Sequence, residues 1–239
     1  MAFKPPSASA GQLAGISFDQ AVDFAPAAKA RFDAFDKTAA GKKDPSMCKA
    51  LLRFPNGGPA FWSSKMAVDA DGPPAGKGLP GGSLLDPDNG QDDTSFQFPK
   101  GGGGLAAEAI PYIVLPRDRP GGKKPFDPAI SIGDLAIVIF GNKITAAICG
   151  DVGPVNKIGE ASIRVHEDLR QQGVPDPCVR RDGKGNCLRI HDVSVEQDVL
   201  FFVFPDSGFG NELTRDNLET LVTERAFGLY NKLRGGDGA

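Results

Sequence analysis

The chain has 239 residues, of which 40% are hydrophobic and 24% charged, with a formal net charge of −3. This balance is typical of a globular protein, and the absence of basic runs interleaved with aromatic residues argues against a nucleic-acid partner. No apolar run approaches the roughly 20 residues that cross a bilayer, so we expect no membrane partner. The 31 glycines and 20 prolines predict a loop-rich β protein rather than a helical bundle.

The N-terminal segment differs from the rest of the chain. Residues 1–15 are mostly Pro, Ser, Ala and Gly, and we expect them to be disordered or left over from expression. They lack the continuous apolar core of a signal peptide, so none is predicted in this chain. We expect residues 16–239 to form a single domain, with its motif-bearing core over about 60–170.

Local patterns predict elements before the core. Helical spacing favours a helix over 27–37, and a short strand is expected over 51–54. In FWSSKMAVDADG, alternation from Phe61 to Ala70 predicts a strand with unlike faces. A long Gly- and Pro-rich stretch, 72–104, is then expected to be a functional loop, and the strand 109–115 follows with prolines at both ends.

A β-hairpin forms the centre of the sequence. The runs Leu135–Phe140 and Ile144–Cys149, separated by Gly141-Asn142-Lys143, predict two antiparallel strands. Beyond them we expect a helix over 162–171, a buried strand over 199–204 and an amphipathic helix over 216–233.

The four cysteines are an even number, and Cys178 and Cys187 bracket a short polar loop that a disulfide could close. The alternative is two free thiols in a reducing compartment. A zinc site is less favoured because no paired CxxC or nearby HxxxH accompanies them. Cys149 lies in an apolar strand and is interpreted as a core residue rather than a nucleophile.

Two acidic residues flank the glycine-rich turn after the hairpin: Asp151 in GDVGP and Glu160 in KIGEAS. Each follows a glycine beyond a strand, where a side chain can face a groove. Glycoside hydrolysis needs two such groups, one acid and one base or nucleophile. The alternative is that both are solvated turn residues, the usual role of Asp or Glu beside glycine.

These motifs, preceded by GDLAIVIFGNK and further upstream by FWSSKMAVDADG and IPYIVLP, resemble the fungal-type chitosanases of glycoside hydrolase family 75 over roughly residues 60–170. The resemblance implies a secreted, endo-acting enzyme that hydrolyses β-1,4 bonds between glucosamine units of chitosan with inversion, without a metal or an organic cofactor. It makes Asp151 and Glu160 the catalytic pair, with Glu160 the acid and Asp151 the base.

A second charged cluster, Lys65, Asp69 and Asp71, would project from one strand face. Its carboxylates could bind the ammonium group of glucosamine; the alternative is an exposed ion pair worth at most about 1 kcal/mol. Further substrate-binding candidates are Thr94, Ser95, Tyr112 and Lys157. Tyr112 and Trp62 could stack on sugars, although single aromatic residues in strands more often belong to the core, and Lys157 could orient a carboxylate or be a solvated loop charge.

The expected fold is mainly β, a six-stranded double-psi-like β-barrel with peripheral α-helices, by resemblance to family 45 cellulases, expansins and lytic transglycosylases. We expect a monomer whose partner is polycationic chitosan, drawn in by the acidic loop residues Asp86, Asp88, Asp92 and Asp93. The alternatives are an expansin-like protein that binds polysaccharide without hydrolysis, and a hydrolase of another glycan such as peptidoglycan. No nucleophile elbow or nucleotide-binding motif is present, so a serine hydrolase or nucleotide enzyme is not predicted.

Overall fold

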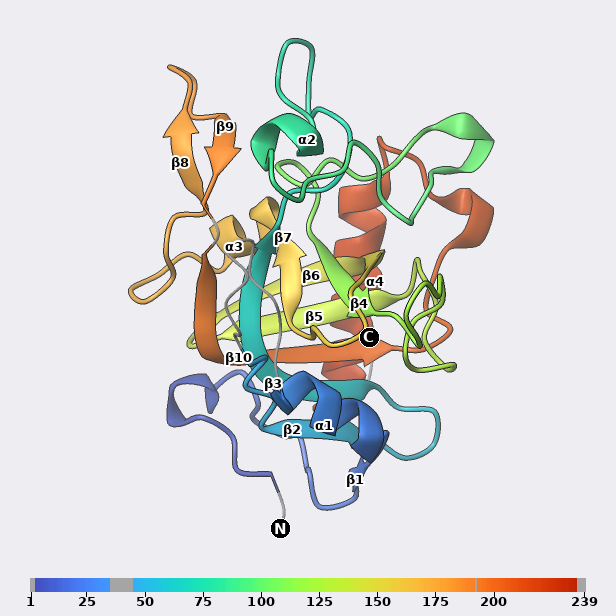
Figure 1. The fold of residues 1–239 in the computed structure, drawn as a ribbon. Coiled ribbons are helices and arrows are strands. Elements are labelled where there is room, and N and C mark those ends of the chain that lie inside the picture. Colours follow the sequence, from blue (N-terminus) through green and yellow to red (C-terminus); the bar gives the residue numbers. More distant parts are fainter. Residues whose placement is uncertain (1–2, 35–44, 192, 236–239) are drawn as a thin grey trace.

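The structure is a computed structural model that describes residues 3–34, 45–191 and 193–235. Six of its strands close into a barrel (Figure 1). In spatial order these are β3 (Ala60–Asp69), β10 (Ser194–Phe204), β5 (Leu135–Phe140), β6 (Lys143–Gly153), β4 (Tyr112–Pro116) and β7 (Glu160–Ser162), which returns to β3. The prediction of a mainly β protein with a six-stranded barrel is confirmed.

Most neighbouring barrel strands are antiparallel, but two pairs, β4–β6 and β3–β7, are parallel. The β5–β6 hairpin follows from its turn: Phe140 pairs with Lys143, and the two-residue connection begins with Gly141 at φ 57°. A left-handed backbone of this kind favours glycine and matches the twist of the strands. The predicted hairpin is thus confirmed.

The remaining elements surround the barrel. Strands β1 (Val22–Asp23) and β2 (Ala50–Arg53) extend the sheet beyond β3, and β8 (Cys178–Arg181) pairs with β9 (Cys187–Ile190) in a separate hairpin. The α-helices are α1 (Pro26–Ala34), α2 (Gly82–Leu85), α3 (Ile163–Asp168) and α4 (Leu218–Leu233). The 3-10 turns are η1 (Ser7–Ser9), η2 (Pro99–Gly101) and η3 (Gly210–Glu212).

Several predicted elements have different ends. The strand expected from residue 109 begins at Tyr112, because the backbone N–H groups of Ala109 and Ile110 close a turn on the carbonyl of Ala106. The strand expected from residue 199 begins at Ser194. The predicted helix over 162–171 ends at Asp168, and Ser162 caps its start. Positions 35–37 of the first predicted helix lie outside the described residues.

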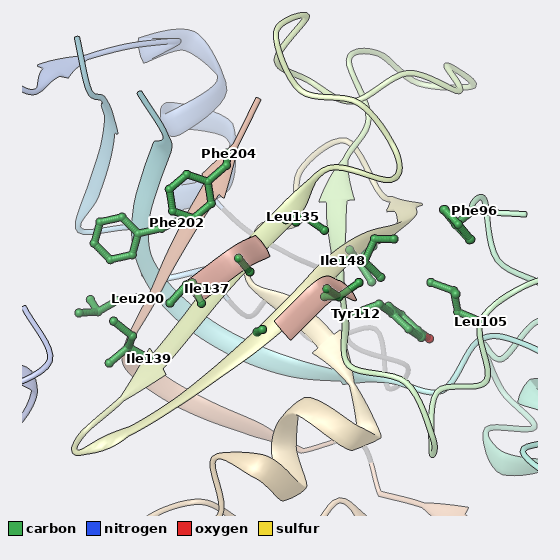
Figure 2. Close-up of a cluster of buried hydrophobic side chains, with 14 of the residues drawn as sticks. Phe96, Leu105, Tyr112, Leu135, Ile137, Ile139, Ile148, Leu200, Phe202 and Phe204 are labelled. Atoms are coloured by element: carbon green, nitrogen blue, oxygen red, sulfur yellow. The ribbon is translucent and has the colours of Figure 1, made fainter. Parts of the chain in front are cut away.

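Alternate residues of the strands belong to two apolar clusters. All six barrel strands contribute to one cluster, which fills the barrel and includes Trp62, Ile113 and Ala161. The other lies against α4 and includes Ile137, Phe202 and Tyr230 (Figure 2). Because both faces of most strands are covered, the central strands read as almost continuous apolar runs.

The N-terminal segment lies against this second cluster. The Phe3 ring packs 5.1 Å from Phe18 and 5.0 Å from Phe61, centroid to centroid. Tyr230 of α4 donates a hydrogen bond to the carbonyl of Gln12 at 2.7 Å. Residues 3–15, expected to be disordered, are thus described in contact with the barrel, and the division of the chain at residue 15 stays a prediction.

Within the described residues, no helix combines the length and the apolar character that a membrane crossing requires.

Candidate active site

A β-bulge in strand β6 positions Asp151. Ile113 of β4 pairs with Cys149, but the next residue, Val114, pairs with Asp151, so Gly150 is the extra residue. A bulge of this kind re-aims the side chain that follows it. The freed carbonyl of Gly150 accepts a hydrogen bond from the N–H of Phe96 at 2.8 Å. This contact attaches the long 72–104 loop to the barrel beside Asp151.

Val114 lies between the two predicted catalytic residues. It pairs with Asp151 of β6 on one side and with Glu160 of β7 on the other. Residues opposite each other on neighbouring strands project from the same face of a sheet. Asp151, Val114 and Glu160 accordingly line one pocket of about 300 Å³.

The pocket lies over one end of the barrel and has walls from outside it. Its floor is formed by β3, β4, β6 and β7, and one wall by Asp86, Asn89 and Gln91 of the long loop. Ile190, the last residue of β9, forms part of another wall. Figure 1 shows α2 and the β8–β9 hairpin standing above the same end of the barrel.

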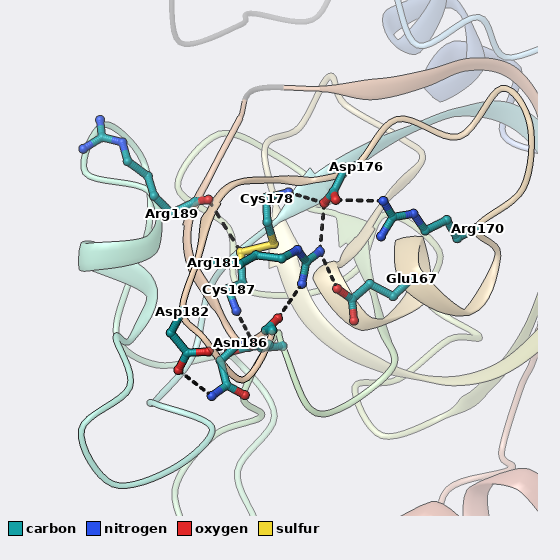
Figure 3. The surroundings of a disulfide bond; sticks show 11 residues. Glu167, Arg170, Asp176, Cys178, Arg181, Asp182, Asn186, Cys187 and Arg189 are labelled. Atoms are coloured by element: carbon teal, nitrogen blue, oxygen red, sulfur yellow. Dashed lines mark hydrogen bonds and ion pairs between the residues drawn. A yellow bond between two sulfur atoms is a disulfide. The ribbon is translucent and has the colours of Figure 1, made fainter.

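The disulfide between Cys178 and Cys187 closes the β8–β9 hairpin, as predicted. Figure 3 shows the ion pairs around it: Arg181 contacts Glu167 at 2.7 Å and Asp176 at 2.8 Å. Since Glu167 belongs to α3, these contacts attach the hairpin to the barrel and so hold the Ile190 wall in place. The remaining cysteines, Cys48 and Cys149, are buried free thiols.

Asp151 is held by three hydrogen-bond donors. The backbone N–H and the hydroxyl of Ser95 both donate to its Oδ1, the former at 2.9 Å, and the N–H of Val152 donates at 2.7 Å. The side chain is 7% exposed. Donors converging on one carboxylate oxygen stabilise the ionised form, which suits a base or a nucleophile.

Glu160 contacts a cation instead. Lys157 Nζ lies 2.6 Å from its Oε1, and both side chains are mostly buried. The turn between the two carboxylates is held by Arg117, whose Nε donates to the carbonyl of Gly153 at 2.6 Å and whose Nη2 donates to that of Val152 at 3.3 Å. The Arg117 side chain therefore stabilises the turn between the two acidic residues, in addition to the hydrogen bonds of the β-ladder.

Asp69 and Asp71 form a hydrogen-bonded group at the end of β3. The N–H of Asp71 donates to Asp69 Oδ1 at 2.6 Å, and Gln91 donates to both oxygens of Asp71, at 2.7 and 3.2 Å. Tyr112 Oη lies 2.8 Å from the Asp71 carbonyl oxygen and 3.1 Å from Asp69 Oδ1. Asp69 Oδ1, both carboxyl oxygens of Asp71 and the Tyr112 hydroxyl group are thus all hydrogen-bonded.

Burial shifts these carboxyl groups toward their neutral forms. It raises the pKa of Asp71 to about 8, since the opposing hydrogen bond from Gln91 is a smaller influence and the charges of Asp151 and Glu160 add to the rise. Burial, followed by the charge of Asp71, also raises the pKa of Asp69 well above its usual range. Near neutral pH, the pocket therefore holds fewer negative charges than its five carboxyl groups suggest.

Three other predicted substrate-binding residues lie outside the pocket lining. Lys65 is buried in β3, with 1% of its surface exposed. Thr94 is buried too; its hydroxyl donates to the Phe96 carbonyl and accepts from Leu105 N–H. Tyr112 is fully buried and reaches the site only through its hydroxyl group, as described above. Trp62, the other aromatic candidate, is fully buried in the barrel.

Sequence reasoning missed several residues of the pocket, among them Gln91 and Arg117. Gln91 lies in the Gly- and Pro-rich stretch with no local pattern around it. Arg117 follows directly after the strand that ends at Pro116, in a loop that the sequence marks only as turn-rich. Both act through contacts with residues distant in the chain, which periodicity does not reveal.

Asp69, Asp71 and Asp151 have one oxygen each within 4.8 Å of the others, a spacing that could also suit a metal ion.

Most glycoside hydrolases use a pair of carboxyl groups that flank the bond to be cleaved, and Asp151 and Glu160 both face one pocket. The family described as fungal chitosanase of glycosyl hydrolase group 75 matches residues 66–212, which is more than half of the chain. The chain belongs to this family, a family of chitosanase-type glycoside hydrolases that act on a polysaccharide. Among curated proteins there is no match to the chain.

Proposed function

We propose that the protein is an endo-chitosanase that hydrolyses β-1,4 bonds between D-glucosamine units with inversion, and that Asp151 and Glu160 are its catalytic residues. The observation that carries the proposal is their common pairing with Val114, which aims both side chains into one pocket. No chemical step of such a reaction requires a metal or an organic cofactor.

Strand geometry supports inversion. Asp151 and Glu160 lie two strands apart across β4, and neighbouring strands are about 4.8 Å apart, so their backbones are separated by about 10 Å. Side chains that lean toward a common substrate from this distance suit the carboxyl separation of about 6.5–9.5 Å that leaves room for a water molecule. The separation of about 5 Å in retaining enzymes would require closer positions.

We assign Asp151 as the base and Glu160 as the acid. The three donors to Asp151 Oδ1 favour a carboxylate that stays ionised and can take a proton from water. Glu160 would protonate the leaving oxygen, and the Lys157 ammonium group at 2.6 Å would stabilise the carboxylate that remains. The same ammonium group favours ionised Glu160 in the free enzyme, so the acid role requires that Glu160 take up a proton before the glycosidic bond is cleaved.

The acidic lining favours a cationic sugar. Besides the catalytic pair it includes Asp69, Asp71 and Asp86, whereas its cations, Lys157 and Arg117, contact Glu160 and backbone carbonyls. An ammonium group at C2 can form a charge-assisted hydrogen bond with such carboxyl groups, and its charge favours their ionised forms, whereas an N-acetyl group carries no charge. We therefore propose Asp69, Asp71 and Lys157 as substrate-binding residues; the burial of Lys65, Thr94 and Tyr112 favours a supporting role for them.

The disulfide supports a working environment that is oxidising, and we propose that the protein is secreted and acts as a monomer. The acidic loop carrying Asp86, Asp88, Asp92 and Asp93 would attract the polycation over a distance, so binding should weaken as salt is added.

The test is the release of reducing ends from highly deacetylated chitosan, compared with chitin, carboxymethylcellulose and peptidoglycan. We expect cleavage of chitosan alone, an inverted anomeric configuration in the first product, and losses of several orders of magnitude for Asp151→Asn and Glu160→Gln. Glu224→Gln, which changes an exposed residue of α4 in the same way, is the control and should behave as wild type. Cleavage of another glycan would favour a different hydrolase, and binding of chitosan without cleavage would favour an expansin-like protein.

A further inference from the structure

A second cavity, of about 510 Å³, adjoins the proposed catalytic base. It is formed within residues 95–99 of the long loop, 131–134 before β5, and 206–213 between β10 and α4. Ser95 belongs to its lining, and the N–H and hydroxyl groups of the same residue donate to Asp151. Since this hydroxyl group is already bonded, Ser95 connects the second cavity with the catalytic pocket rather than binding a ligand itself.

The catalytic pocket has room for only a small part of a polymer. Its volume of about 300 Å³ is at the lower end of the range for sites that bind one small ligand. An endo-acting hydrolase binds sugar units on both sides of the bond that it cleaves, so the polysaccharide must continue beyond this pocket. The second cavity is the larger of the two and adjoins the pocket at Ser95, so room for further units lies next to Asp151.

The polar lining of the second cavity suits a cationic ligand with many hydrogen-bond donors. Asp206 is exposed there, and no basic residue is found among the described residues that line the cavity. The amide nitrogen of Gln97 donates to Asp93 at 2.8 Å and to the Thr94 carbonyl at 2.7 Å, so its oxygen remains as the acceptor for a ligand. Carboxylate and amide oxygens accept hydrogen bonds from ammonium and hydroxyl groups, both of which glucosamine units carry.

Two aromatic rings supply apolar surface in the same cavity. Phe96 and Phe209 belong to its lining, and a small part of each side chain is accessible. Sites for small ligands combine such apolar surface with a few polar groups that fix the orientation of the ligand. A sugar ring, which presents C–H groups on its faces and polar groups at its edge, matches this combination.

The wall that follows β10 is held in place without a ligand. The Arg225 guanidinium group of α4 lies 3.7 Å from the centre of the Phe209 ring, and it donates to the carbonyls of Ser207 and Gly208 at 3.3 Å each. Ser207 N–H also donates to Asp134 at 3.0 Å, which attaches this wall to the turn before β5. A wall that is already formed lowers the entropic cost of binding.

We propose that the second cavity is a distal subsite, in which Asp206 binds the ammonium group of a glucosamine unit belonging to the same chitosan chain as the units in the catalytic pocket. This role rests on the proposed function, which supplies the chitosan. It gives the connection between β10 and α4 a part in substrate binding.

The first test compares glucosamine oligomers of two lengths by calorimetry. All proteins carry Glu160→Gln so that the oligomers stay intact. Adding Asp206→Asn and Asn211→Ala, both at exposed positions of the second cavity, should weaken binding of the hexamer about five- to fiftyfold, as expected for one exposed ion pair and one hydrogen bond. Binding of the dimer, which fills only the catalytic pocket, should stay within about twofold. Asp216→Asn, exposed but outside the cavity, is the control and should leave both affinities unchanged.

Nuclear magnetic resonance provides a second readout, which locates the oligomer without the variants at 206 and 211. The amide signals of Gly208, Gly210 and Asn211 should shift on addition of the hexamer and not of the dimer. Unchanged hexamer affinity in the added variants, or shifts confined to the catalytic pocket, would overturn the proposal. If these signals shift but the wild-type protein does not cleave chitosan, the proposed function fails and the subsite stands. Cleavage of chitosan without these shifts supports the proposed function and refutes the subsite.

Discussion

Ser95 is the residue through which the 72–104 loop reaches Asp151, and its hydroxyl group can be removed with little change in volume. In Ser95→Ala, Asp151 Oδ1 loses the hydroxyl donor but keeps the N–H groups of residue 95 at 2.9 Å and of Val152 at 2.7 Å. Val152 N–H loses its contact with Ser95 Oγ, 3.2 Å away, and keeps the one with Asp151. The carboxylate is thus held less firmly in its orientation but keeps two hydrogen-bond donors.

The magnitude follows from the kind of bond. A hydrogen bond to a charged group contributes about 1.5–3 kcal/mol. Because two donors remain, we take the lower half of this range, which corresponds to a fall in kcat of about 10- to 40-fold. Ser95→Thr keeps a hydroxyl group and should restore most of the activity. KM should change little, since Ser95 is not part of the pocket lining.

The assay is the steady-state release of reducing ends from deacetylated chitosan. Ser83→Ala is a matched control in the same loop: its hydroxyl donates to Asp92 at 2.7 Å, away from the catalytic pair. It should show wild-type kinetics. A Ser95→Ala variant with kcat within twofold of wild type, or a loss equal to that of Ser83→Ala, would refute the reasoning.

Three further predictions follow from the site and its supports. Glu160→Gln should regain activity on a glucosamine oligomer with an activated aryl leaving group, which needs no protonation, whereas Asp151→Asn should not; equal recovery would reverse or remove the assigned roles. His166 is fully buried, and burial lowers its pKa from 6.5 to about 4. As pH falls from 6.5 toward 4, only the unfolded chain takes up this proton, so wild type should lose stability relative to His166→Met by about 3 kcal/mol, measured by urea denaturation at several pH values; a pH-independent difference would contradict this. Replacing Cys178 and Cys187 by serine opens a loop of sequence separation 9 and should lower the free energy of unfolding by about 2–3 kcal/mol. It should also raise KM, because the hairpin carries the Ile190 wall; an unchanged KM would show that the wall does not contact substrate.

The sequence allowed the barrel hairpin to be predicted because its signal is local. Gly141 and Asn142 between two apolar runs define a two-residue turn. The first strand has the expected ends, Leu135–Phe140, and the second, Lys143–Gly153, contains the expected run and extends four residues beyond it. Closure of the barrel depends instead on β3 pairing with β7, whose paired residues, such as Asp69 and Ser162, are far apart in the chain. Only the family resemblance, and not periodicity, indicated that closure.

The candidate site shows the same difference between local signals and contacts of residues far apart in the chain. Asp151 and Glu160 stand in recognisable motifs, and both line the pocket. Alternation correctly placed Lys65 and Asp69 in one strand, but it does not reveal that only Asp69 reaches the pocket, because the burial of a strand residue depends on what packs over it. Gln91 and Arg117 act through contacts across 20 and 36 positions of sequence, respectively, which no local pattern encodes.

The bulge at Gly150 has a consequence for engineering the substrate range. The Phe96 N–H bonds to the Gly150 carbonyl, and Ser95 bonds to Asp151, so this part of the loop and the proposed base move as one body. Grafts that lengthen or reshape the wall near residues 91–96 would therefore disturb the chemistry together with the fit. The exposed positions Pro74 to Gly78, in the same loop but away from these contacts, offer a place where extensions could add contacts to a longer polymer without disturbing the catalytic carboxylate.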